Sequence, residues 1–173
     1  EAFISEVEKK PTPYNFCPKP IDFISVSNLS AHIADSVTFV ESLLTELSDL
    51  EMIWEPMETT TVSGFQSPPG MNLLENPTGK VAQLKSVIVK EIESYYLKFK
   101  NEQCPYIRKF PTTVGLSGWT VTLKKQGYQN AHIHADGWLS GVIYLKVVPS
   151  LDKGEGAIKF GLNGDHYYNV DVP

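Results

Sequence analysis

The most informative stretch of this chain is HIHADGWLSGVIYL, residues 132–145. On an extended strand, residues i and i+2 point to the same face. His132 and His134 would therefore share a face, and Asp136 would join them if the strand runs on or turns gently. Two imidazoles and a carboxylate on one face are ligands for a transition metal. Val142–Leu145 would form a buried strand that holds this site rigidly.

The histidine pair also has interpretations without a metal. The two rings could be exposed residues on a sheet edge, a hydrogen-bonded pair, or a general acid and base. Two buried polar rings must both find partners, which favours metal binding. Non-haem Fe(II) enzymes use this ligand set, and zinc accepts similar ligands. A third ligand could come from His166, the only later histidine, whereas His32 lies in a predicted helix and is expected to be structural.

Composition predicts one globular domain that binds neither nucleic acid nor membrane. The 173 residues are 42% hydrophobic and 20% charged, with a net charge of −5, which suits one core of ordinary size. Arg108 is the single arginine, which argues against a basic nucleic-acid groove. No apolar run is long enough to cross a bilayer, and no signal-peptide pattern is present. Cys17 and Cys104 lack a CxxC partner, which predicts two reduced thiols in a cytoplasmic protein, with a disulfide as the alternative.

The first hundred residues divide into an arm, two helices and a loop. Residues 1–27 are polar and then proline-rich, which indicates a linker or extended arm before a domain over 28–173. Helical periodicity predicts one helix within 28–50, capped by Asn28 or Ser30, and a second over 80–99. Residues 55–79 are rich in Thr, Ser, Gly and Pro and are predicted to form a loop. The apolar faces are Ile33, Val37, Val40, Leu44 and Leu47 in the first helix, and Val81, Leu84, Ile88, Ile92, Tyr95 and Phe99 in the second.

The pattern changes to that of strands after Pro111. Trp119, Val121 and Leu123 alternate with polar residues, as in a half-buried strand. Helices followed by strands predict an α+β fold, with helices packed on one face of a mainly antiparallel sheet or barrel. Further strands are predicted over 129–135, 139–148, 156–161 and 166–172.

Residues 127–134 together with 139–145 resemble the 2-oxoglutarate–Fe(II) oxygenase family that is related to prolyl hydroxylases and often follows tetratricopeptide repeats. The family signature is H-x-H followed closely by S-G-V-Y-Y-L, and Ile143 replaces its first tyrosine. The resemblance spans about 55–160. Its upstream part consists of Thr59–Thr61, Gly64–Ser67 and Asn72–Leu74.

This resemblance implies a double-stranded β-helix, or jelly roll, with packed N-terminal helices. It also implies a non-haem Fe(II)- and 2-oxoglutarate-dependent dioxygenase, in particular a hydroxylase. His132 matches the first metal ligand of the wider H-x-D/E…H pattern, and His134 stands where that pattern has its carboxylate. The third ligand is therefore open among His134, Asp136 and water. The side chains expected to line the cosubstrate pocket are Tyr128, Asn130, Ser140 and Tyr144.

Two parts of the wider oxygenase pattern do not follow the motif. They are a distal histidine, for which His166 is a candidate substitute, and a basic residue for the 2-oxoglutarate carboxylate, a role that suits arginine. A jelly roll needs eight strands, and about five are predicted from residue 116 onward. We therefore expect a domain truncated at its C-terminus, with an open sheet edge that favours a homo-oligomer. The alternatives are a cupin-like metal enzyme without 2-oxoglutarate and a non-catalytic binding or scaffold module. The substrate would be a small molecule or a peptide.

Overall fold

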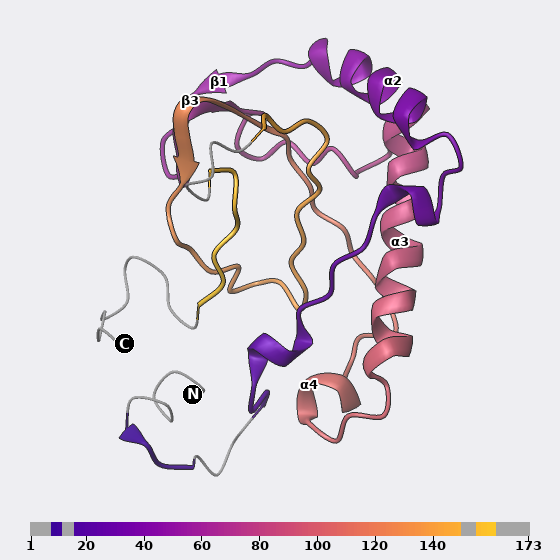
Figure 1. Ribbon diagram of the computed structural model, residues 1–173, viewed down its shortest axis with the longest axis vertical. Coiled ribbons are helices and arrows are strands. Elements are labelled where there is room, and N and C mark those ends of the chain that lie inside the picture. The colour runs from indigo at the N-terminus through magenta and orange to yellow at the C-terminus, as the bar shows by residue number, and fades with distance from the viewer. Residues whose placement is uncertain (1–7, 12–15, 150–154, 162–173) are drawn as a thin grey trace.

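The computed structural model describes residues 8–11, 16–149 and 155–161. It has an α+β fold, as predicted, in which helix α3 runs along one side and a three-stranded antiparallel sheet lies at the opposite side (Figure 1). Across the described ranges, no helix is both long and apolar enough to cross a bilayer. The elements in chain order are the short 3-10 helices η1 (Pro20–Phe23) and η2 (Leu29–Ala31), α2 (Ser36–Ser48), β1 (Ile53–Trp54), β2 (Thr61–Gln66), α3 (Gly79–Phe99), α4 (Pro105–Arg108) and β3 (Val121–Gln129).

Helix α3 confirms the prediction for 80–99, whereas the helix predicted within 28–50 is split in two. The Asn28 side chain accepts a hydrogen bond from Ser30 N at 2.9 Å and caps η2. The Asp35 side chain accepts one from Thr38 N at 3.1 Å and caps α2. Each side chain satisfies a backbone N–H that a starting helix leaves free. The predicted cap Asn28 therefore begins a single 3-10 turn, and the long helix begins at a second cap.

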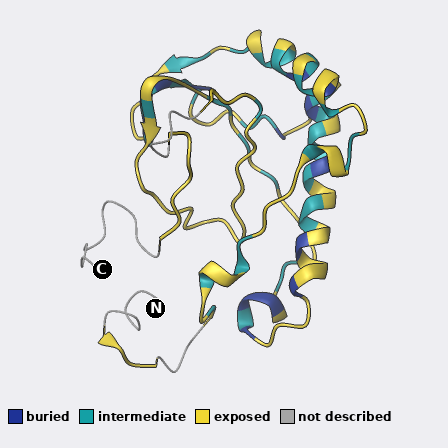
Figure 2. Cartoon of the chain, viewed as in Figure 1, coloured by how far each residue is buried: buried dark blue, intermediate teal, exposed yellow. Residues whose placement is uncertain are grey.

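One part of the core lies between α2 and α3. Phe39 and Leu43 of α2 pack with Leu74 and with Val81 of α3. The buried positions are coloured dark blue along both helices in Figure 2. Leu43 is completely buried, whereas Val37, which was predicted to belong to the apolar face, is 70% exposed. The buried face of α2 is therefore centred on Phe39 and Leu43, with Val40 and Leu47 of the predicted face partly buried beside them.

A second part of the core lies at the C-terminal end of α3. It contains Tyr95, Phe99, Tyr106 and Ile107 together with Cys104, and the arm residues Cys17 and Phe23 pack against it. Tyr95 donates its hydroxyl proton to the Phe23 carbonyl at 2.9 Å. Part of the predicted arm therefore rests on α3 and α4, and the predicted domain boundary at 27/28 stays a prediction.

The sheet has the order β1-β2-β3, and β2 lies inside the region predicted to be a loop. That part of the loop prediction was wrong. The sequence shows no strand pattern here because Thr61 and Gln66, two of the buried residues of β2, are polar. Their side chains are hydrogen-bonded to each other, from Thr61 Oγ1 to Gln66 Oε1 at 2.9 Å. Thr61 pairs with Gln129, and Gln66 pairs with Val121.

The β2–β3 ladder is interrupted by a bulge between Val62 and Gly64. Ser63 and Gln126 both take positive φ values there, of 49° and 63°. Gly127 follows, and a Cβ on it would lie 2.4 Å from the carbonyl oxygen of Ser63. Because Cβ atoms essentially never lie within 3.0 Å of another heavy atom, only glycine lets the two backbones approach so closely.

The strands predicted after β3 are not formed in the described residues. Residues 130–149 and 155–161 contain no strand, and the predicted strand 166–172 lies outside the described residues. Of the expected buried strand Val142–Leu145, only Leu145 packs against the α2–α3 core, and the other three side chains are exposed. A strand requires a neighbour that pairs with its backbone, so apolar composition alone did not predict one here. The jelly roll stays a prediction.

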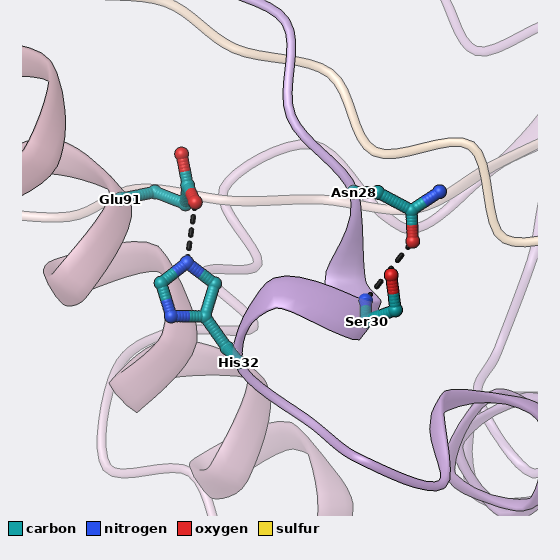
Figure 3. Close-up of polar contacts among 4 residues, drawn as sticks. All are labelled: Asn28, Ser30, His32 and Glu91. Carbon is teal, nitrogen blue, oxygen red and sulfur yellow. Dashed lines mark hydrogen bonds and ion pairs between the residues drawn. The ribbon is translucent and has the colours of Figure 1, made fainter.

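A side-chain hydrogen bond joins the segment before α2 to α3. His32 Nε2 is hydrogen-bonded to Glu91 Oε1, and Asn28 caps the turn that presents His32 (Figure 3). The hydrogen bond from His32 lowers the pKa of Glu91 below its ordinary value of 4.5. A structural role for His32 is therefore supported by its contact.

We expect the Glu91→Gln variant to lose a pH-dependent part of its stability. A carboxyl whose pKa is lower in the folded state stabilises the fold above its unfolded value and loses that contribution as the pH falls through its folded pKa. The difference in unfolding free energy from wild type should be present above pH 4.5 and shrink below it. Because Glu91 is partly exposed, solvent screens the pair and limits the difference to about 1 kcal/mol. Urea denaturation at several pH values measures it, and a difference that does not depend on pH would contradict this prediction.

Candidate functional site

The sheet fixes where the histidine segment begins. β3 ends at Gln129, and the next residue, Asn130, donates its N–H to the Thr60 carbonyl at 2.9 Å. The Gln129 side chain also donates to Thr61 Oγ1 at 3.2 Å. The start of β2 therefore holds the chain two residues before His132.

His132 and His134 lie together, as predicted from their spacing. The two Nε2 atoms are 3.2 Å apart, and the ring centroids are 4.8 Å apart with the planes nearly perpendicular. His132 Nδ1 lies 2.7 Å from the Asn130 carbonyl oxygen. Because a carbonyl can only accept, neutral His132 carries its proton on Nδ1 and its Nε2 accepts from His134 Nε2.

Asp136 does not join the two histidines. The Gly137 N–H donates to the His134 carbonyl at 3.1 Å, so the chain turns at residues 135–136 instead of continuing as a strand. In a turn the i, i+2 alternation of side chains is lost. Within the ranges that the structure describes, no three His, Cys, Asp or Glu side chains are grouped as metal ligands would be. Two of the three predicted ligands therefore lie together, and the turn separates the third from them.

Trp119, two residues before β3, packs against the ring of His134. Its ring centroid lies 5.6 Å from that of His134 at an interplanar angle of 50°. Both histidine side chains are exposed, but partial burial lowers the pKa of His134 below its ordinary value of 6.5, and the nearby charge of protonated His132 lowers it further. His134 therefore keeps the neutral, metal-binding form to a lower pH than a free imidazole does.

We expect the ring protons of His134 to titrate with a pKa below 6.5 in an NMR experiment on the metal-free chain. In the His132→Gln variant the value should rise toward 6.5 without reaching it, because burial is the larger cause and remains. A His134 pKa above 6.5 in the wild type would contradict the described environment.

The other predicted site residues are spread around the pair. Tyr128 lies on β3 opposite Val62 and is half exposed. Asn130 contacts the pair through its backbone carbonyl rather than its side chain. Ser140 and Tyr144 are exposed, and among the described residues neither is hydrogen-bonded to the histidines. His166 lies outside the described residues.

Two supporting contacts were not predicted from the sequence. One is the packing of Trp119 on His134, since Trp119 was interpreted only as a strand residue. The other is an aromatic stack that reaches the histidine segment from the arm. Trp138 stacks on Tyr106 with centroids 6.0 Å apart and planes at 15°, and its edge meets Phe16 at 5.3 Å. Residues this far apart in the chain leave no local pattern that would pair them.

The two histidine side chains fit a divalent metal as two neighbouring ligands. Metal–nitrogen bonds to histidine are about 2.0–2.1 Å long in zinc sites, so one ion can bridge two nitrogens that lie 3.2 Å apart. The Nδ1–H of His132 is already bonded to a carbonyl, as is usual for a metal-ligating histidine, and this fixes the ring orientation. The pair therefore has the donor atoms, spacing and outer support of half a metal site.

Comparison with known proteins identifies the segment that carries this pair. The model of the family described as "Putative 2OG-Fe(II) oxygenase" matches residues 117–167. The match includes β3, both histidines and the S-G-V motif, whereas the upstream resemblance at 59–74 lies outside it. No curated protein and no solved structure matches the chain. Residues 117–167 of this chain therefore match the 2OG-Fe(II) oxygenase family, which confirms the resemblance seen in its sequence.

Proposed function

We propose that this chain is part of a non-haem Fe(II)- and 2-oxoglutarate-dependent dioxygenase, a hydroxylase, in which His132 and His134 hold the metal. The observation that carries the proposal is the pair of Nε2 atoms 3.2 Å apart inside the segment that matches the oxygenase family. Asp136 is the candidate third ligand if the turn at 135–136 opens on metal binding, and water is the alternative.

The residues around the pair have definite tasks in this proposal. Asn130, held by β2, fixes the His132 ring through its carbonyl, and Trp119 packs against the His134 ring. Fe(II) held by the two histidines would supply, together with 2-oxoglutarate and O₂, the oxidising power to hydroxylate a C–H bond of the substrate. Tyr128 and Asn130, together with Ser140 and Tyr144, are the candidates for binding the cosubstrate.

The rest of the proposal concerns fold, partners and location. The β1-β2-β3 sheet would be one part of a jelly roll over 28–173, with residues 1–27 as the arm. β3 has one neighbour, β2, in the described sheet, and its other edge could pair with a second copy of the chain. We propose a small-molecule or peptide substrate and a cytoplasmic location.

The test is an anaerobic titration of the full chain with Fe(II) in the presence of 2-oxoglutarate. The chelate of Fe(II) with 2-oxoglutarate gives a weak visible charge-transfer band, which should appear in the wild type and be absent from a His132→Ala/His134→Ala variant. His32→Gln is the matched control, because it removes a histidine elsewhere and should keep the band. Circular dichroism checks that each variant is folded.

The other outcomes favour the two alternative functions. Metal binding without a band would overturn the 2-oxoglutarate assignment and favour a cupin-like metal enzyme that needs no cosubstrate. No metal binding by a folded chain would overturn the metal assignment and favour a non-catalytic binding or scaffold module. A band that persists in the double variant would show that other residues hold the iron.

A further inference from the structure

Two cysteines that are distant in the sequence meet beneath the arm. Cys17 packs against the aromatic cluster that contains Cys104, and Cys104 is buried at the start of α4. The backbone draws the two segments together, since Tyr106 N donates to the Phe16 carbonyl at 3.0 Å. The Cys104 thiol is also near enough to be one of the causes that raise the pKa of Cys17. The two cysteines are therefore neighbours in the folded chain.

The two thiols lie between the aromatic cluster and a hollow on the protein surface. Phe99 and Ile107 belong to the cluster that covers them from within. A surface hollow lies outside, between Lys19 and Asp22 of the arm and Glu102 of the α3–α4 connection, and Cys104 is part of its lining. Cys104, although buried, therefore lies close to the molecular surface.

We propose that Cys17 and Cys104 form a disulfide bond that ties the arm to α4, made by exchange with a small disulfide of the glutathione class. One cysteine attacks oxidised glutathione as its thiolate, forms a mixed disulfide and releases one glutathione thiolate. The thiolate of the other cysteine then attacks the protein sulfur and releases the second. Two protein thiols lose two electrons in total, and one glutathione disulfide gains them.

The bond would act on the segment that carries the histidine pair. Phe16, next to Cys17, packs against both Tyr106 and Trp138, and Trp138 follows His134 by four residues. Fixing residue 17 to residue 104 would hold this aromatic stack in place. The proposal does not rest on the proposed oxygenase activity. It requires the two thiols, the arm and an oxidising glutathione pool, so it is the alternative to the reduced thiols expected of a cytoplasmic protein.

The surroundings of Cys17 predict a disulfide that forms slowly and then stabilises the fold, rather than one that forms and breaks rapidly. Burial and the neighbouring Cys104 thiol raise the pKa of Cys17 to about 11, so little thiolate is present at neutral pH while the arm is seated. Exchange depends on the thiolate. Formation should therefore occur during folding or when the arm lifts.

The experiment is refolding of the urea-denatured full chain in a buffer of reduced and oxidised glutathione, followed by alkylation under denaturing conditions and mass spectrometry. We expect the wild type to lose both alkylatable thiols without gaining glutathione, and a protease digest to contain the peptide pair linked through Cys17 and Cys104. The Cys17→Ser and Cys104→Ser variants should retain a free thiol or carry one glutathione. Because the closed loop is long, the oxidised wild type should melt about 5 to 15 °C above its reduced form.

A control in urea and two possible outcomes test whether the disulfide depends on the fold. The same mixture kept in urea should give less of the linked form, since the unfolded chain does not hold the two thiols together. Two free thiols or two mixed disulfides in the refolded wild type would overturn the proposal. A linked form that melts at or below the temperature of the reduced chain would also overturn it, because the bond would then strain the fold rather than tie it.

Discussion

Replacing Leu43 with alanine is expected to lower the free energy of unfolding by about 2–5 kcal/mol, the usual cost of deleting a buried leucine side chain. Leu43 is 0% exposed and packs between α2 and α3 with Phe39, Leu74 and Val81. The loss is large because a domain of this size is stabilised by only about 5–15 kcal/mol in total. Urea denaturation followed by circular dichroism measures it.

Val37→Ala is the matched control for this substitution. Val37 lies on the same helix but is 70% exposed, so its truncation should change stability by no more than about 0.5 kcal/mol. Equal effects at the two positions would contradict the described face of α2. The Leu43 variant should also loosen the segment after the histidines, because Leu145 packs against the same cluster.

Replacing either His132 or His134 with alanine is expected to weaken Fe(II) binding by more than the roughly 10–100-fold that loss of an outer partner of a metal ligand costs. Each variant removes one of two nitrogens that lie 3.2 Å apart and leaves the other without a chelating neighbour. Competition with a metal chelator under anaerobic conditions measures the affinity.

Two further variants make this result specific. Asp136→Asn separates the choices for the third ligand: a large loss of affinity would require that the turn at 135–136 rearranges, and no loss would favour water. His32→Gln should bind Fe(II) as the wild type does, because His32 contacts Glu91 and not the pair. Unchanged affinity in both His132→Ala and His134→Ala would exclude these residues as ligands.

The helices and the histidine pair could be predicted because their signals are local. A 3.6-residue period predicts α3 from its own sequence, and an H-x-H spacing places two rings on one side of an extended segment whatever lies around it. The family resemblance at 127–145 is also a short, contiguous pattern, and the family model confirms it.

The parts that could not be predicted depend on contacts between distant residues. β2 has polar inward residues, and it is a strand because β3 pairs with it more than fifty residues later. Residues 142–145 have the composition of a buried strand but have no pairing partner in the part of the chain that is described. Asp136 was expected to join the histidines if the strand ran on or turned gently, whereas a hydrogen bond from Gly137 N–H to the His134 carbonyl turns the chain more sharply. Trp119, Trp138 and Phe16 gave no signal of their roles, since their contacts are formed only in the folded chain.

The central claim is that His132 and His134 together ligate Fe(II), and X-ray absorption at the iron edge of the anaerobically loaded chain tests it. The multiple scattering of imidazole rings reports how many histidines ligate the metal. Two rings in the wild type and His32→Gln, with one ring in His132→Ala and in His134→Ala, is the predicted result. Iron bound without imidazole scattering, or a spectrum that neither alanine variant changes, would contradict it.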